Sequence, residues 1–192
     1  LALTIYAFDY QTYIQTIQVL PSTGPYIMVT ETTFNDNDDN VFTAGETILM
    51  GMALSNIGSE IASNVSVTLS STDQYITIIN PVLNIGNIAS GDASSIEDFQ
   101  IQLANNIPDE HLVELTVTIA TIDGDVFEYN RSFIVYAPLI TWGALQIDDS
   151  TGNNNGRIDA GENVTLTYTV TNSGHCNASD ISTDIVIDGV PY

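Results

Sequence analysis

Positive charge is almost missing from this sequence. It contains no lysine and two arginines, Arg131 and Arg157, against 24 acidic residues, so the formal net charge of the 192 residues is −22. A surface of this sign repels nucleic-acid phosphates and anionic lipid headgroups. We therefore expect no nucleic-acid partner and no membrane insertion. The same carboxylates keep a protein soluble, and they attract cations that relieve their mutual repulsion.

Cysteine, long apolar runs and helical periodicity are scarce as well. Cys176 is the single cysteine, so no disulfide can form within the chain. No run of 18 apolar residues occurs, so no membrane-spanning helix is expected. No segment repeats its apolar residues at helical spacing over three turns, which argues against an α-helical fold.

Patterns of catalytic residues are also lacking. The sequence shows no phosphate loop, zinc-site spacing or recognisable triad. His175 and Cys176 could suggest a base and a nucleophile, but neighbouring residues on a strand point in different directions. We expect that this chain is not an enzyme.

The sequence is rich in short segments in which apolar and polar residues alternate. About seven such segments occur in roughly 110 residues, with turn residues between them, as is typical of a β-sandwich. A closing hairpin is predicted across Asp123-Gly124, whereas residues 81–98 are predicted to be rich in turns. The predicted strands include residues 26–33, 48–54, 65–69, 75–79, 99–103, 112–120 and 126–136. Two further strands are predicted at residues 142–147 and 164–170. The predicted fold class is therefore all-β, with immunoglobulin-like β-sandwiches.

Two loops of this sequence match the ligand spacing of an EF-hand calcium loop. Residues 35–46 and 151–162 are dense in oxygen-bearing side chains, and both end in Ala-Gly-Glu. An EF-hand loop presents ligands at its first, third, fifth, seventh, ninth and twelfth positions, the seventh through a backbone carbonyl. The first loop has Asn35, Asn37, Asp39, Val41, Thr43 and Glu46 at these positions. The second has Thr151, Asn153, Asn155, Arg157, Asp159 and Glu162.

An EF-hand loop usually begins with aspartate, but Asn35 and Thr151 stand at the first position here. In the second loop Asp148 and Asp149 are close enough to take the place of Thr151. We predict that both loops bind Ca²⁺ between β-strands, as structural clamps rather than sensors. The alternative is that both are solvated turns of Asn and Asp without a metal.

The pattern of the chain repeats. Glu46, Asn56 and Gly58 correspond to Glu162, Asn172 and Gly174 at one offset, 162 − 46 = 116, without gaps. The segment 1–20, predicted to be a hairpin, resembles the closing hairpin near residues 115–136. We therefore predict three parts: residues 1–22 close a preceding repeat, 23–139 form a complete repeat, and 140–192 form the first half of a further one. The chain would then be a window of a tandem array, or a subunit whose two ends complete each other between molecules.

The complete unit resembles a known kind of module. The motifs that carry the resemblance are Asn-Asp-Asn-Asp-Asp-Asn…Ala-Gly-Glu, Leu-Ser-Asn-Ile-Gly, Asn-Ile-Pro-Asp-Glu-His and Tyr-Ala-Pro. It is similar to the CARDB-like, immunoglobulin-like repeats of large secreted bacterial proteins, which also follow the catalytic domain of gingipain-type cysteine peptidases. The resemblance implies a secreted or cell-surface location and a spacing, anchoring or adhesive role.

Two functions follow as hypotheses. The first is a non-catalytic, calcium-stabilised module of an extracellular bacterial protein, whose partners are the neighbouring repeats. The second is a self-assembling filament or adhesin subunit. There the hairpin 1–20 of one subunit would complete the unfinished sandwich 140–192 of the next by strand addition.

Overall fold

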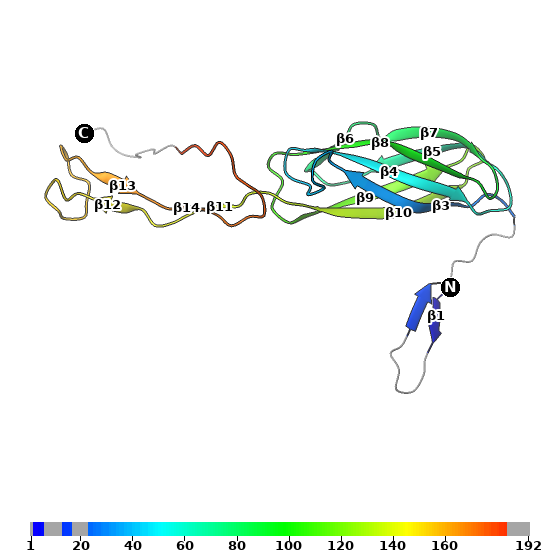
Figure 1. The fold of residues 1–192 in the computed structure, drawn as a ribbon, viewed down its shortest axis with the longest axis horizontal. Helices are drawn as coiled ribbons and strands as arrows, with labels where there is room; N and C mark the ends of the chain where they lie inside the picture. Colours follow the sequence, from blue (N-terminus) through cyan, green and yellow to red (C-terminus); the bar gives the residue numbers. More distant parts are fainter. Residues whose placement is uncertain (1, 6–12, 17–22, 184–192) are drawn as a thin grey trace.

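The computed structural model of the chain describes residues 2–5, 13–16 and 23–183 (Figure 1). Every regular element in these ranges is a β-strand, which confirms the all-β prediction. Within the same ranges no helix is long and apolar enough to cross a membrane.

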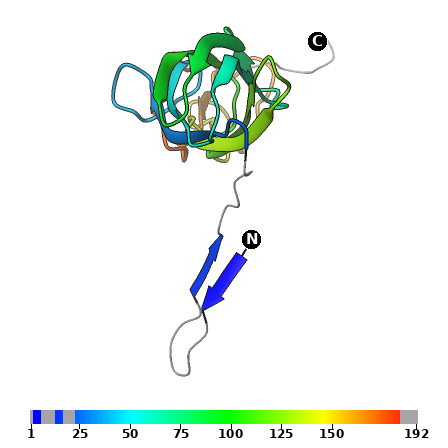
Figure 2. The same ribbon diagram turned by 90° about the vertical axis from the view of Figure 1, so that its right-hand side faces the viewer.

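Residues 27–135 form two antiparallel sheets of four strands, which lie face to face when viewed end-on (Figure 2). One sheet has the order β3 (Ile27–Asn35), β4 (Thr47–Asn56), β8 (Ala93–Leu103) and β6 (Ile76–Ile78). The other has the order β10 (Val126–Val135), β9 (His111–Ala120), β5 (Ala62–Ser70) and β7 (Val82–Ile88). The predicted β-sandwich is therefore present.

The order of the strands is that of an immunoglobulin-type domain with one addition. In a constant-type domain the first, second, fifth and fourth strands form one sheet, and the third, sixth and seventh form the other. If β7 is set aside, the remaining strands follow this order. The extra strand, β7, lies beside β5 at the edge of the second sheet.

The core lies between the sheets because each strand alternates its side chains. In β4, Ile48, Met50, Met52 and Leu54 are buried, and β9 contributes four more apolar side chains of the same kind. Phe99 of β8 lies opposite Met50 and is fully buried. The predicted hairpin of β9 and β10 is confirmed, with Gly124 at φ +96° in a connection that spans residues 121–125.

The prediction for residues 81–98 was wrong. These residues contain β7 and the first half of β8 rather than a run of turns. In β7, Gly86 has a φ of +91°, and the register with β5 shifts next to it. Such bulges break the strict alternation by which a strand is recognised in a sequence.

Two short strand pairs follow the sandwich. β11 (Ile140–Trp142) pairs with β14 (Val170–Asn172), and β12 (Gln146–Asp148) pairs with β13 (Thr165–Thr167). The strands predicted at 142–147 and 164–170 are therefore interrupted, and Gly143 N–H donates to Thr169 O in the gap. In the N-terminal segment β1 (Ala2–Ile5) pairs with β2 (Tyr13–Thr16), as the predicted hairpin requires. The rest of the hairpin, and residues 184–192, lie outside the described residues.

The two units share one local arrangement around an asparagine. Asn56 Oδ1 accepts the N–H groups of Tyr26 and Gly58, and its Nδ2 donates to Glu60 O. Asn172 makes the same three bonds, with Leu139, Gly174 and Cys176 as partners. At Gly58 and at Gly174 a Cβ would overlap the backbone of the Pro-containing segment that enters the unit.

Candidate metal-binding loops

The first loop connects β3 to β4, and its backbone is held by carboxylate and amide side chains. Asn35 Oδ1 accepts the N–H of Asn37 (2.6 Å), and Asp39 Oδ1 accepts that of Val41 (2.8 Å). Such bonds curl the chain so that alternate side chains lie on the inside of the loop.

Asp36 lies at the centre of this loop, although the EF-hand spacing did not select it. Its Oδ1 accepts the N–H groups of Asp38 (2.8 Å) and Asn40 (3.1 Å). Its Oδ2 is buried and has no hydrogen-bond partner, the single such side-chain atom among the described residues. Asn37 and Asn40 have positive φ values, 67° and 63°, which asparagine tolerates better than most residues.

The end of the first loop is closed by Glu46. Its two carboxylate oxygens accept the N–H and the hydroxyl of Thr43, at 2.8 and 2.6 Å. Gly45 precedes it with a φ of +86°, and a Cβ there would overlap the side chain of Asn105. A carboxylate therefore accepts backbone hydrogen bonds at each end of the loop, Asp36 at the start and Glu46 at the end.

The second loop connects β12 to β13 and is centred on Asp149, which is 3% exposed. Asp149 Oδ2 accepts the N–H groups of Asn155 (2.7 Å) and Gly156 (2.9 Å). Gly156 has a φ of +77°, as its place in the loop requires. Thr151 instead directs its hydroxyl to Asn163 O, away from these bonds.

The other predicted residues of the second loop converge on two carboxylates. The Nδ2 groups of Asn153 and Asn155 donate to Asp159 Oδ2 at 2.8 and 2.6 Å, and these bonds lower the pKa of Asp159. Glu162 accepts the N–H groups of Asn153 and Asp159. Arg157 donates its N–H to Asn155 Oδ1, and its charge also favours the ionised form of Asp159.

Asp36 and Asp149 occupy equivalent places in the two loops. They are separated by 149 − 36 = 113 residues, as are the segments at Tyr26 and Leu139 that bond to the two asparagines. After the loops the offset is 116, so the second loop region is three residues longer. Asp36 is matched to Asp149 only when the two copies are aligned at an offset of 113 residues before the loops and 116 after them. A single ungapped alignment conceals this match.

The loops mix carboxylates with neutral oxygen ligands. Among the residues that the structure describes, no three His, Cys, Asp or Glu side chains are grouped closely enough to hold a metal by themselves. The donor set of each loop consists of two or more carboxylates with amide, hydroxyl and carbonyl oxygens. This is the chemistry that Ca²⁺ prefers.

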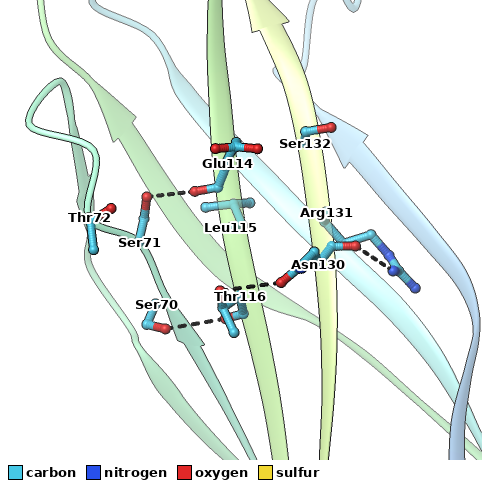
Figure 3. Close-up of a pocket in the computed structure, with 9 residues that line it drawn as sticks. All are labelled: Ser70, Ser71, Thr72, Glu114, Leu115, Thr116, Asn130, Arg131 and Ser132. Carbon is cyan, nitrogen blue, oxygen red and sulfur yellow. Dashed lines mark hydrogen bonds between the residues drawn. The ribbon is translucent and has the colours of Figure 1, made fainter.

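A shallow groove of about 640 Å³ lies elsewhere, over the end of β5 and the middle of β9 and β10 (Figure 3). Ser71 Oγ donates to Glu114 O and Ser70 Oγ to Thr116 O, so these hydroxyls already bond to the backbone. No aromatic side chain lines the groove. It therefore presents no aromatic face on which a sugar ring could stack.

The two histidines of the chain each pair with an aspartate. His111 Nε2 lies 2.7 Å from Asp73 Oδ2, and His175 Nδ1 lies 2.8 Å from Asp109 Oδ2. Burial, together with the carboxylates of Asp109, Glu46 and Asp39, raises the pKa of the Cys176 thiol. A raised pKa keeps a thiol protonated and unreactive, which is the opposite of what a nucleophile needs.

No family model matches the sequence, and a search of curated proteins finds no match. The native α2-macroglobulin of Escherichia coli, in a structure from domain MG7 to the C-terminus, is 12% identical over 70% of this chain, with a TM-score of 0.44. The chain spans 22% of the length of that structure. A chain of the archaellum periplasmic stator protein complex FlaF and FlaG from Sulfolobus acidocaldarius is 16% identical to this chain, with a TM-score of 0.33. The match covers 66% of this chain and 100% of the stator chain. These likenesses are too low to carry an argument, so the fold class rests on the strand order.

Proposed function

We propose that the chain is a non-catalytic, calcium-stabilised structural module of an extracellular protein, arranged in tandem with similar modules. The observation that carries the proposal is Asp36 Oδ2, a buried carboxylate oxygen without a partner in a loop of EF-hand spacing. A buried acceptor without a partner costs free energy, and a cation beside it removes that cost.

In the first loop Asp36 would act as the initial ligand in place of Asn35, with Asn37, Asp39 and Glu46 completing the set. In the second loop Asp149 would take this role, together with Asn153, Asn155, Asp159 and Glu162. A calcium ion supplies positive charge that offsets the repulsion between the carboxylates of each loop. The residues of the chain hold the loop closed and orient the strands on either side of it.

Calcium binding to the whole chain would be measured by titration calorimetry. We expect two sites with dissociation constants of roughly 10⁻⁴–10⁻³ M, as in extracellular modules. At free calcium ten times that value, each site adds about 1.4 kcal/mol to the free energy of unfolding. Asp36→Asn should remove one site and Asp149→Asn the other.

The matched control is Asp38→Asn, which removes a carboxylate from the same loop. The backbone N–H that Asp38 donates to Asp36 is unchanged by this substitution. The control variant should leave both sites in place. Unchanged binding heat in both Asp36→Asn and Asp149→Asn would refute the calcium proposal. Loss of a site in the control variant would mean that overall charge, and not the loop geometry, attracts the ion.

The tandem arrangement is supported by the two equivalent asparagines, Asn56 and Asn172, with their matching partners. The parent that the sequence resemblance favours is a large secreted protein with CARDB-like repeats, as in gingipain-type peptidases. We place the module outside the cell, where free calcium reaches the concentration that such weak loops need.

A second candidate is the filament or adhesin subunit. Trp142, Leu145 and Ile181 in the second unit are more than half exposed, so among the described residues this unit leaves apolar side chains that strands of another subunit could cover. A hairpin such as 1–20 supplies two strands, however, and the position equivalent to the central strand β8 would stay empty. Sedimentation velocity at several concentrations separates the candidates, because concentration-dependent polymers favour the filament and a constant monomer excludes it.

A further inference from the structure

The sandwich and the second unit meet at a small joint made of three chain segments. The linker after β10 is held by the first loop, since Tyr136 exchanges backbone hydrogen bonds with Phe42 and Ala44 (2.9 and 3.1 Å). The loop before β9 contributes Asp109, whose Oδ1 accepts the N–H of Ala137 at 3.0 Å. The turn after β14 brings His175 to the same place.

The imidazole of His175 lies beside two carboxylates and an aromatic ring. Its Nδ1 lies 2.8 Å from Asp109 Oδ2, and its Nε2 lies 3.6 Å from Glu110 Oε1. Its ring packs on that of Tyr136, with 5.2 Å between the centroids. Asp109 is 11% exposed and His175 52%, so the acid is fixed in the sandwich while the imidazole remains open to protons from solvent.

We propose that His175 is a pH-sensitive latch that sets how firmly the second unit is held against the sandwich. When the imidazole is protonated, both ring nitrogens donate toward carboxylates. When it is neutral and Nδ1 keeps its proton for Asp109, the lone pair of Nε2 faces the Glu110 carboxylate and repels it. One deprotonation therefore changes an attraction into a repulsion at the contact with Glu110.

The charged groups around the latch are otherwise acidic. Asp109 and Glu110 face His175 from the loop before β9, and Tyr136 faces it from the linker. The charges of Asp39 and Glu46 in the first loop also help to raise the pKa of Cys176, the residue next to His175. Among the described residues near the joint, protonated His175 is thus the group that offsets this negative charge.

The direction of the pH dependence follows from the two partners. The hydrogen bond and charge of Asp109 raise the pKa of His175 above its ordinary 6.5, and hydrogen bonds from Ala137 and His175 lower the pKa of Asp109 below 3.8. The stabilisation of the joint by protonated His175 is complete below pH 6.5 and is lost as the pH rises through the raised pKa of His175. The stabilisation by ionised Asp109 is lost only in more acidic solution, as the pH falls through the lowered pKa of Asp109. The joint is therefore stiffest in mildly acidic solution.

The latch is tested on the whole chain with spin labels on either side of the joint. In a Cys176→Ser background, Glu128→Cys on β10 and Leu145→Cys in the second unit provide two exposed positions. The width of the distance distribution between the labels is measured in EDTA, so that calcium binding plays no part. We expect it to broaden by about twofold between about pH 5.5 and about pH 8.5, as the imidazolium is lost.

Three variants define the outcome. His175→Gln keeps a side-chain donor but does not titrate, so it should remove the pH dependence. Asp109→Asn keeps an oxygen for the Ala137 N–H without the charge that raises the pKa of His175, so it should shift the pH dependence to lower pH. His111→Gln, which changes the histidine paired with Asp73 outside the joint, should keep it. The proposal would be overturned if the width of the distance distribution stays constant in the labelled protein that keeps His175. It would also be overturned if the pH dependence survives in His175→Gln. Imidazole NMR of the two histidines gives the pKa of His175 in the same samples.

Discussion

At the scale of single residues, Asn56 ties together the entry and the turn of the sandwich unit. Its side chain is fully buried and makes four hydrogen bonds, accepting from Tyr26 and Gly58 and donating to Glu60 O and Ile88 O. A buried amide with all these groups satisfied stabilises one arrangement of the chain, whereas its loss removes four hydrogen bonds to the backbone at once.

We predict that Asn56→Ala lowers the free energy of unfolding by about 3 kcal/mol or more, since each unsatisfied buried group costs about 1–3 kcal/mol. Urea unfolding followed by circular dichroism measures the change. The chain provides its own control, because Asn172 makes three equivalent bonds at an exposed position. Asn172→Ala should cost less than half as much. Equal losses would mean that burial does not set the cost.

The residues of the candidate loops could be predicted only in part from the sequence. Side chains such as Asn153, Asn155 and Glu162 follow from the EF-hand spacing, and the structure places them around the same loop. Asp36 could not be found in this way because it precedes the third position by one residue. Its importance depends on the path of the backbone, which folds the N–H groups of Asp38 and Asn40 onto its carboxylate.

At the scale of elements, β8 joins the two halves of its sheet, since it pairs with β4 on one side and β6 on the other. Phe99 anchors this strand in the core and is fully buried. Removing a buried phenyl ring costs the transfer free energy of its atoms and leaves a cavity.

Phe99→Ala should therefore lower the free energy of unfolding by about 3–5 kcal/mol. Trp142 lies outside the sandwich and is 61% exposed, so its fluorescence is unsuited to this measurement and far-UV circular dichroism is used instead. Leu112→Ala serves as the control, because Leu112 of β9 is 51% exposed. We expect its effect to stay within about 0.5 kcal/mol. A loss below 1 kcal/mol for Phe99→Ala would contradict its place in the core.

Strands with strict alternation, such as β4 and β9, could be predicted from the sequence, whereas β7 and the interruption of the two strands after Tyr136 could not. Alternation reveals a strand when one of its faces is buried and the other is solvated. β7 lies at an edge and is bent at Gly86, and its outward face includes the apolar Val82. β13 and β14 pair on one side only among the described residues, so nothing holds them in one continuous strand.

At the scale of the whole molecule, the charge is the dominant physical property. The chain has a net charge of −22, and in its described part every ion pair involves a histidine. Neither arginine is paired with a carboxylate there, since Arg131 bonds to Thr32 and to the Asn130 carbonyl. The repulsion between carboxylates therefore acts against the compact state with little local compensation.

Salt should stabilise this protein apart from any calcium site. The screening length shortens from about 30 Å at 0.01 M salt to less than 10 Å above physiological ionic strength, so the long-range repulsion between carboxylates is largely removed. We predict that the melting temperature in EDTA rises by about 5 °C or more between about 10 mM and 500 mM NaCl, equivalent to roughly 1–2 kcal/mol. The doubly substituted Asp36→Asn, Asp149→Asn chain should show the same rise, because screening does not require the loops. A melting temperature independent of NaCl would show that the carboxylates are already compensated within the fold, and calcium would then have little repulsion left to relieve.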